Sequence, residues 1–178
     1  MTFSNNINFF INNFKSFTDQ TAFIWQDKSY SYSHLLKRIQ FWQQSLVNYP
    51  AGAIIGLESD FSPETIAILF VLIEKNVIIV PLDIHHSEKN LRKIDIAQLD
   101  YLIKINTEDN IEFTRINSTI KKNFLYHSIN EKGVPALVLF TSGSSGEPKG
   151  ALHDFSKLLN KFKVKRHALL TINFLLFD

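Results

Sequence analysis

A short apolar segment that breaks into a glycine-rich loop constrains this chain most. Residues 136–140 (Ala-Leu-Val-Leu-Phe) are all apolar, and residues 141–150 (Thr-Ser-Gly-Ser-Ser-Gly-Glu-Pro-Lys-Gly) follow at once. The apolar run predicts a buried strand, because turn-forming residues flank it. The glycines relax the backbone so that successive N–H groups can converge on an oxyanion, and the hydroxyl side chains add donors. The stretch therefore predicts a strand followed by a phosphate-binding loop.

Lys149 supplies the positive charge of this loop. A lysine amine neutralises phosphate oxygens as a compact point charge, and Pro148 fixes the backbone just before it. The Walker loop needs a hydroxyl residue directly after its lysine, whereas Gly150 follows Lys149. The spacing of the glycines also differs from the dinucleotide fingerprint G-x-G-x-x-G. A flexible Gly/Ser loop without chemistry is the alternative, and the preceding strand and the Pro-Lys-Gly sequence argue against it.

Residues 139–150 resemble the signature phosphate loop of the adenylate-forming (AMP-binding) superfamily, which comprises acyl-CoA synthetases, amino-acid adenylation domains and luciferases. The match to T-S-G-[ST]-[ST]-G-x-P-K-G holds at every fixed position. The resemblance implies ATP as cosubstrate, with Mg²⁺ bridging its phosphates. It implies a catalytic role for Lys149, which would neutralise the departing β- and γ-phosphates. The residues that it places on the phosphates are Thr141, Ser142, Gly143, Ser144, Ser145, Gly146 and Lys149.

Strand and helix signals earlier in the chain predict βαβ units. We expect strands over 53–57, 77–80 and 101–105, with helices over 62–75 and 87–97 between them. Strands that alternate with helices at this spacing predict a mostly parallel sheet. The fold class is therefore α/β. By resemblance, the chain is the N-terminal portion of the large domain of an adenylate-forming enzyme, and it is incomplete.

The N-terminal part predicts two more helices and a hairpin. Residues 21–25 and 28–32 flank a Gln-Asp turn and predict the hairpin. We expect Ser33 to cap the helix that follows. The first helix has its apolar stripe at Phe3, Ile7, Phe10, Phe14 and Phe17. The second has its stripe at Leu35, Ile39, Trp42 and Leu46.

The second half of the chain is less regular. Residues 106–134 predict short strands around 111–116 and 124–126, and a helix capped by Asp154 is expected after the loop. Residues 169–177 predict a last apolar strand, whose exposed edge favours self-association. Because that strand stops without a cap or turn, we expect residues 1–178 to be a partial AMP-binding domain, truncated before the adenine pocket and the C-terminal lysine domain that the resemblance implies.

Composition argues against several classes of protein. The 178 residues carry a net charge of only +2 and no cysteine. A near-neutral balance argues against a nucleic-acid partner, and the lack of cysteine removes disulfides and cysteine-ligated zinc. His85 and His86 are adjacent, so their side chains diverge and no metal ligands are expected. No apolar run is long enough for a membrane span, and we expect a cytoplasmic protein.

The resemblance implies attack of a carboxylate on the α-phosphate of ATP, which gives an acyl-adenylate and pyrophosphate. The main expectation is a fragment of an acid–thiol ligase of acyl-CoA synthetase type, with a carboxylic acid as substrate and CoA or a carrier-protein thiol as acceptor. The alternative is a fragment of an amino-acid adenylation domain of peptide-synthetase type, in which Asp178 would hold the substrate ammonium. A non-catalytic nucleotide-binding or complementing module is the third reading. The 178-residue chain alone is expected to be inactive.

Overall fold

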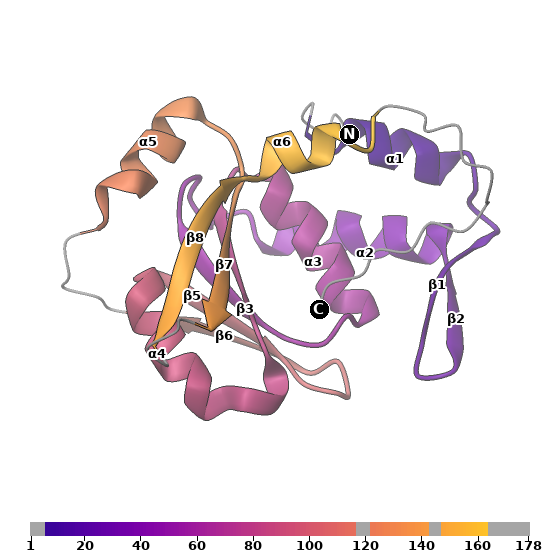
Figure 1. The fold of residues 1–178 in the computed structure, drawn as a ribbon. Helices are drawn as coiled ribbons and strands as arrows, with labels where there is room; N and C mark the ends of the chain where they lie inside the picture. Colours follow the sequence, from indigo (N-terminus) through magenta and orange to yellow (C-terminus); the bar gives the residue numbers. More distant parts are fainter. Residues whose placement is uncertain (1–5, 117–121, 143–146, 164–178) are drawn as a thin grey trace.

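The computed structural model describes residues 6–116, 122–142 and 147–163, which form a six-stranded mixed sheet with helices on both faces and a separate hairpin (Figure 1). The strand order in the sheet is β6-β5-β3-β4-β7-β8. Strands β3, β4, β5 and β7 run parallel, and the outer strands β6 and β8 are antiparallel to their neighbours. This confirms the α/β class with a mostly parallel sheet. The strands are β3 (Ile54–Glu58), β4 (Ile78–Leu82), β5 (Tyr101–Ile105), β6 (Ile111–Arg115), β7 (Ala136–Ser142) and β8 (Pro148–Asp154).

The centre of the sheet is apolar on both faces. All five residues of β3 are buried, as are four of the five in β4. Strands of a parallel sheet are apolar on both faces because crossover helices cover them from both sides. Gly56 in β3 lies against the end of the crossover that joins β4 to β5. A Cβ atom on Gly56 would be 2.4 Å from the Leu99 Cδ1 atom. The sequence therefore needs glycine where this crossover approaches the sheet.

Helices cover both faces of the sheet (Figure 1). One apolar cluster joins the first face to α1 (Asn8–Lys15), α2 (Tyr32–Ser45), α3 (Pro63–Glu74) and α6 (Phe155–Asn160). The second cluster joins the other face to α4 (Ser87–Ala97) and α5 (Phe124–Lys132). The hairpin of β1 (Thr21–Trp25) and β2 (Lys28–Ser31) packs beside α2, away from the sheet. Of the described helices, none combines the length and apolar character needed to cross a bilayer.

Several local expectations are confirmed. Helix α3 begins with Pro63 after the N-cap Ser62, and Asp154 caps α6. The β1–β2 hairpin, α4 and β5 have the expected positions. The expected apolar stripe of α2 is buried, since its three residues within the helix and Leu46, the C-cap, are between 0% and 7% exposed. Periodicity and capping signals therefore identified these elements from short windows of sequence.

Two expectations at the N-terminus need correction. The N-cap of α2 is Ser31, whose Oγ accepts the backbone N–H of His34 at 3.2 Å, and Ser33 lies inside the helix. Helix α1 is shorter than its stripe suggested. It ends at Lys15, so Phe17 leaves the helical periodicity and is 46% exposed. Phe3 lies outside the described residues.

The predicted strand around residues 124–126 is wrong, because this segment is helix α5. Asn123 caps α5 by accepting the backbone N–H of Leu125 at 3.0 Å, and Gly133 ends it in the left-handed region with φ of +59°. Tyr126 and Ile129 are three residues apart and both buried, which is the spacing of one helical face. The asparagine and glycine that bound the segment are capping residues, and this signal outweighs the short apolar run.

Ser62→Ala is expected to lower the free energy of unfolding by about 1–2 kcal/mol. The Ser62 Oγ is buried, accepts the backbone N–H of Thr65 at 3.2 Å and shares a hydrogen bond with the Thr65 hydroxyl, so its loss leaves buried partners unsatisfied. Urea denaturation measures the change. Ser128→Ala, at an exposed position of α5, is the matched control and is expected to change stability by less than about 0.5 kcal/mol. Equal effects of both substitutions would contradict the capping role.

Candidate functional site

The expected phosphate loop joins β7 to β8. These two strands are antiparallel partners, with Thr141 opposite Lys149. Because β7 runs parallel to β4, the loop leaves the sheet at the edge where the carboxyl ends of the parallel strands lie. Open α/β sheets bind their ligands at this edge. Ser142 is the last residue of β7, and Gly143, Ser144, Ser145 and Gly146 lie outside the described residues.

Thr141 and Lys149 project from the same face of the hairpin, since they are directly opposite in antiparallel strands. Leu137 and Leu139 lie on this face too, by the alternation of a strand. Leu137 is 7% exposed in the cluster that contains α6, whereas Leu139 is 36% exposed. The helical cover therefore ends before the loop, and Thr141 and Lys149 are both exposed. Among the described residues, nothing accepts a hydrogen bond from the Lys149 amine or pairs with it, so the amine is free to meet an anion.

Gly150 has a structural role that differs from the expected loop flexibility. It lies within β8 opposite Phe140, and its φ is not in the left-handed region. A Cβ at this position would come within 3.3 Å of the Phe140 ring and of a Val138 methyl group. Phe140 packs against the apolar cluster beneath α4 and α5. Glycine here lets that ring lie against the neighbouring strand at the base of the loop.

The structure adds one charged residue that sequence reasoning missed. The Arg92 guanidinium of α4 forms an ion pair with the Glu147 carboxylate, which lies at the end of the loop. The two residues are 55 positions apart, so no local pattern could have connected them. Both side chains are more than half exposed, at 66% and 60%, and such a pair contributes at most about 1 kcal/mol. The pair shows that α4 lies beside the end of the loop.

The paired histidines both contact Asp83. His86 Nδ1 lies 2.5 Å from the Asp83 carboxylate directly after β4. The hydrogen bond with His86, aided by the backbone N–H of His85, lowers the pKa of Asp83. In the part of the chain that the structure describes, no group of three His, Cys, Asp or Glu residues could hold a metal ion. Asp178 and the expected strand 169–177 lie outside that part.

Asp109→Asn is expected to stabilise the protein at pH 7 by less than about 1 kcal/mol, since solvent screens a partly exposed carboxylate. Burial, and then the charge of Glu64, raise the pKa of Asp109 above its ordinary value of 3.8, against a hydrogen bond from Ser62. The folded state therefore binds this proton more tightly than the unfolded state, and the contribution to stability is lost as pH rises through the raised pKa. Asparagine carries no charge and tolerates the φ of +61° at this position.

Urea denaturation at several pH values tests this prediction. The stability difference between Asp109→Asn and the original protein should be largest at pH 7 and should narrow as the pH falls toward about 4. Ser128→Ala, at an exposed position that carries no charge, is the control and should give no such dependence. A difference that stays constant with pH would show that ionisation of Asp109 is not its cause.

Comparison with known proteins gives consistent matches. A family model described as AMP-binding enzyme matches residues 10–173. The chain is 26% identical over 146 residues to Trichosetin synthetase PKS-NRPS1 of Gibberella fujikuroi. The matched segment covers 75% of this chain and 4% of that protein. It is 31% identical over 114 residues to the nonribosomal peptide synthetase kk1B of Curvularia clavata. That matched segment covers 57% of this chain and 1% of the synthetase. The chain thus spans a small part of these relatives.

Solved structures share the fold. The N-terminal subdomain of NpsA from Klebsiella oxytoca, in complex with 3-hydroxyanthranilyl-AMSN, matches with a TM-score of 0.60 at 20% identity, over 85% of this chain and 40% of that one. VinN in complex with 3-methylaspartate matches with a TM-score of 0.61 at 15% identity, over 88% of this chain and 49% of that one. At these identities the likeness supports the fold alone.

Proposed function

Because the chain belongs to the AMP-binding enzyme family, whose model matches residues 10–173, we propose that it is the N-terminal part of an adenylation enzyme that activates an amino acid with ATP. The observation that carries the proposal is the hairpin that presents Thr141 and Lys149, uncovered, at the ligand-binding edge of the sheet. The loop sequence between these strands matches the family's phosphate loop at every fixed position. Because the chain spans a small part of its relatives, the activity of the whole protein is proposed from this part.

The matched relatives favour an amino acid over other carboxylic acids. The curated relatives are peptide synthetases or hybrids that contain one, and they include a cyclosporin synthetase of Tolypocladium inflatum. Among the matched structures, VinN was solved with 3-methylaspartate and L-aspartate, and NpsA with 3-hydroxyanthranilyl-AMSN and 3-hydroxybenzoyl-AMSN, so the preference for an amino acid rests on the matched sequences. The acyl-CoA synthetase reading has no support among these matches, so the alternative of an amino-acid adenylation domain replaces it. Asp178 remains the residue proposed to hold the substrate ammonium.

The chemistry assigns distinct tasks to the residues of the hairpin. A carboxylate oxygen of the substrate forms a bond to the α-phosphorus of ATP, and the bond from that phosphorus to the β-phosphate bridging oxygen breaks. The products are an acyl-adenylate and pyrophosphate, so negative charge grows on the leaving group. Lys149 stabilises that charge, and Thr141 donates a hydrogen bond to a phosphate oxygen. Bound Mg²⁺ would neutralise part of the phosphate charge.

We propose a carrier-protein thiol as the acceptor of the activated group. One matched structure is an artificially fused adenylation–PCP di-domain of NpsA and ThdA from Klebsiella oxytoca, with a TM-score of 0.63 at 19% identity over 85% of this chain and 33% of that one. No match supports CoA as the acceptor. Transfer of the radiolabelled amino acid to a carrier protein, and not to free CoA, is the expected result when both are supplied to the enzyme that carries this chain.

Amino-acid-dependent exchange of pyrophosphate with ATP tests the proposed activity. The enzyme that carries this chain should incorporate labelled pyrophosphate into ATP with at least one amino acid from a panel of the common twenty. Aliphatic and aromatic acids that lack the amine should give less exchange. Exchange that depends on a fatty acid instead would restore the acyl-ligase reading, and the lack of exchange with either panel would favour a non-catalytic module.

A further inference from the structure

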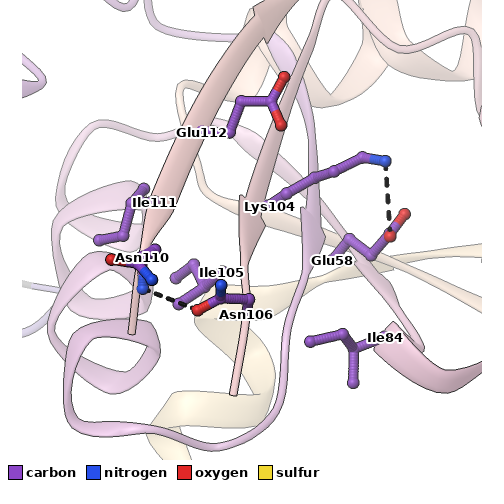
Figure 2. A pocket seen from close by; sticks show the side chains of 8 residues that line it. All are labelled: Glu58, Ile84, Lys104, Ile105, Asn106, Asn110, Ile111 and Glu112. Atoms are coloured by element: carbon purple, nitrogen blue, oxygen red, sulfur yellow. Dashed lines mark hydrogen bonds and ion pairs between the residues drawn. The ribbon is translucent and has the colours of Figure 1, made fainter. Parts of the chain in front are cut away.

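Charged side chains lie at the carboxyl edge of the sheet both beside the β7–β8 hairpin and away from it. Glu58, Lys104 and Glu112 form a row across β3, β5 and β6, as the strand registers show, and they line a cavity of about 290 Å³ (Figure 2). Strand β4 lies between this row and β7. The Arg92–Glu147 ion pair, in contrast, includes the residue directly before β8. Of the two groups, the ion pair is therefore the one that adjoins the proposed phosphate site.

Glu147 places a negative charge close to the residues that are proposed to bind phosphate. It lies two residues before Lys149. Even a fully extended chain separates the Cα atoms of such residues by only about 7 Å. Charges at separations of this order act on each other, because the Debye length at physiological salt is about 8 Å. An uncompensated carboxylate at Glu147 would therefore repel a polyphosphate that Lys149 attracts.

Arg92 compensates this charge from a different element. Its guanidinium pairs with the Glu147 carboxylate, and its helix α4 packs on the other face of the sheet. Thr141 and Lys149 project from the first face, together with Leu137. Among the described residues, neither member of the ion pair has a further side-chain hydrogen bond or ion pair. Arg92 thus neutralises Glu147 without occupying the face on which phosphate is expected.

We propose that Arg92 sets the affinity of the hairpin for polyphosphate by neutralising Glu147. Arg92 acts on the site only through the Glu147 carboxylate, so it is a positioning residue and not a catalytic one. The pair adds little to stability, because both side chains are more than half exposed, but its two charges still act on an anion nearby. This role rests on the proposed function, and it adds a residue from α4, which lies far from the loop in the sequence.

Binding of inorganic tripolyphosphate to the 178-residue chain, measured by calorimetry at low ionic strength, tests this role. Arg92→Gln leaves Glu147 uncompensated and should weaken binding about threefold or more. Glu147→Gln removes the repulsion and frees the Arg92 charge, so binding should strengthen about threefold or more. The double variant restores the balance of charge and should bind within about twofold of the original chain. The differences should narrow as the Debye length falls from about 30 Å at about 0.01 M salt to about 8 Å at about 0.15 M.

Matched variants separate this local effect from the net charge of the chain. Lys132→Gln and Glu131→Gln make the same charge changes at exposed positions of α5, which precedes β7 and lies at the opposite end of that strand from the loop. Each should leave the affinity within about 1.5-fold of the original, since salt screens distant charges. Arg92→Lys keeps the positive charge and should bind tripolyphosphate within about twofold of the original chain.

Two results would overturn the proposal. One is an affinity that Arg92→Gln leaves unchanged. The other is equal weakening in both single variants and in the double variant, which would mean that the pair only supports the local structure. If Lys149→Ala weakens binding and the Arg92 and Glu147 variants do not change it, this role fails and the phosphate site stands. A lack of binding by the original chain would overturn both.

Discussion

Lys149→Ala is expected to slow amino-acid-dependent exchange of pyrophosphate with ATP by about tenfold or more, which corresponds to at least about 1.4 kcal/mol of transition-state stabilisation. The physical reason is that negative charge grows on the leaving pyrophosphate, and the Lys149 amine is the cation that the hairpin presents to it. The amine is exposed and has no competing partner among the described residues, so none of its charge is already compensated there. Its loss should therefore appear mainly in the chemical step.

The control for this prediction is Lys132→Ala, which removes an exposed lysine from α5 at the same cost in net charge. Its exchange rate should stay within about twofold of the original, since an exposed charge far from the loop is screened by solvent. In the isolated 178-residue chain, Lys149→Ala should also weaken binding of inorganic tripolyphosphate, as measured by calorimetry. Exchange and binding that are both insensitive to Lys149 would remove the phosphate role from this residue.

Ile79→Ala is expected to lower the free energy of unfolding by about 2–5 kcal/mol, the largest stability effect that we predict. Ile79 is fully buried in β4, and the registers place it between Ile55 of β3 and Leu137 of β7. Truncation would leave a cavity in the apolar cluster that joins the sheet to α1, α2 and α3, and rigid strands on both sides prevent collapse around it. Urea denaturation with unchanged slope would measure the loss directly.

Ile24→Ala provides the matched control for the core substitution. Ile24 also lies in a strand, but its side chain is 68% exposed on the hairpin. The same truncation there should cost less than about 0.5 kcal/mol. Comparable losses at the two positions would mean that Ile79 does not carry the packing that the structure assigns to it.

The regular part of the fold was predictable from sequence because its signals are short-range. A serine followed by proline predicts the start of α3, and the alternation of apolar runs with helical segments predicts a parallel sheet. The errors occurred where two short-range signals compete. At residues 124–126 an apolar run suggested a strand, and the flanking Asn123 and Gly133 produced a helix instead. Ser31 and Ser33 both suit a cap, and only the backbone conformation decides between them.

The features of the candidate site also separate into those that the sequence predicted and those that only the tertiary structure identified. The sequence by itself determined the loop motif, the family and the role expected of Lys149, because these depend on consecutive residues. Only the tertiary structure decided that Lys149 and Thr141 share an uncovered face, that Arg92 lies beside Glu147, and that Glu58, Lys104 and Glu112 form one row. The physical reason is that such neighbours are set by strand order and register. The burial of the whole apolar core selects that order, and no local window of sequence contains it.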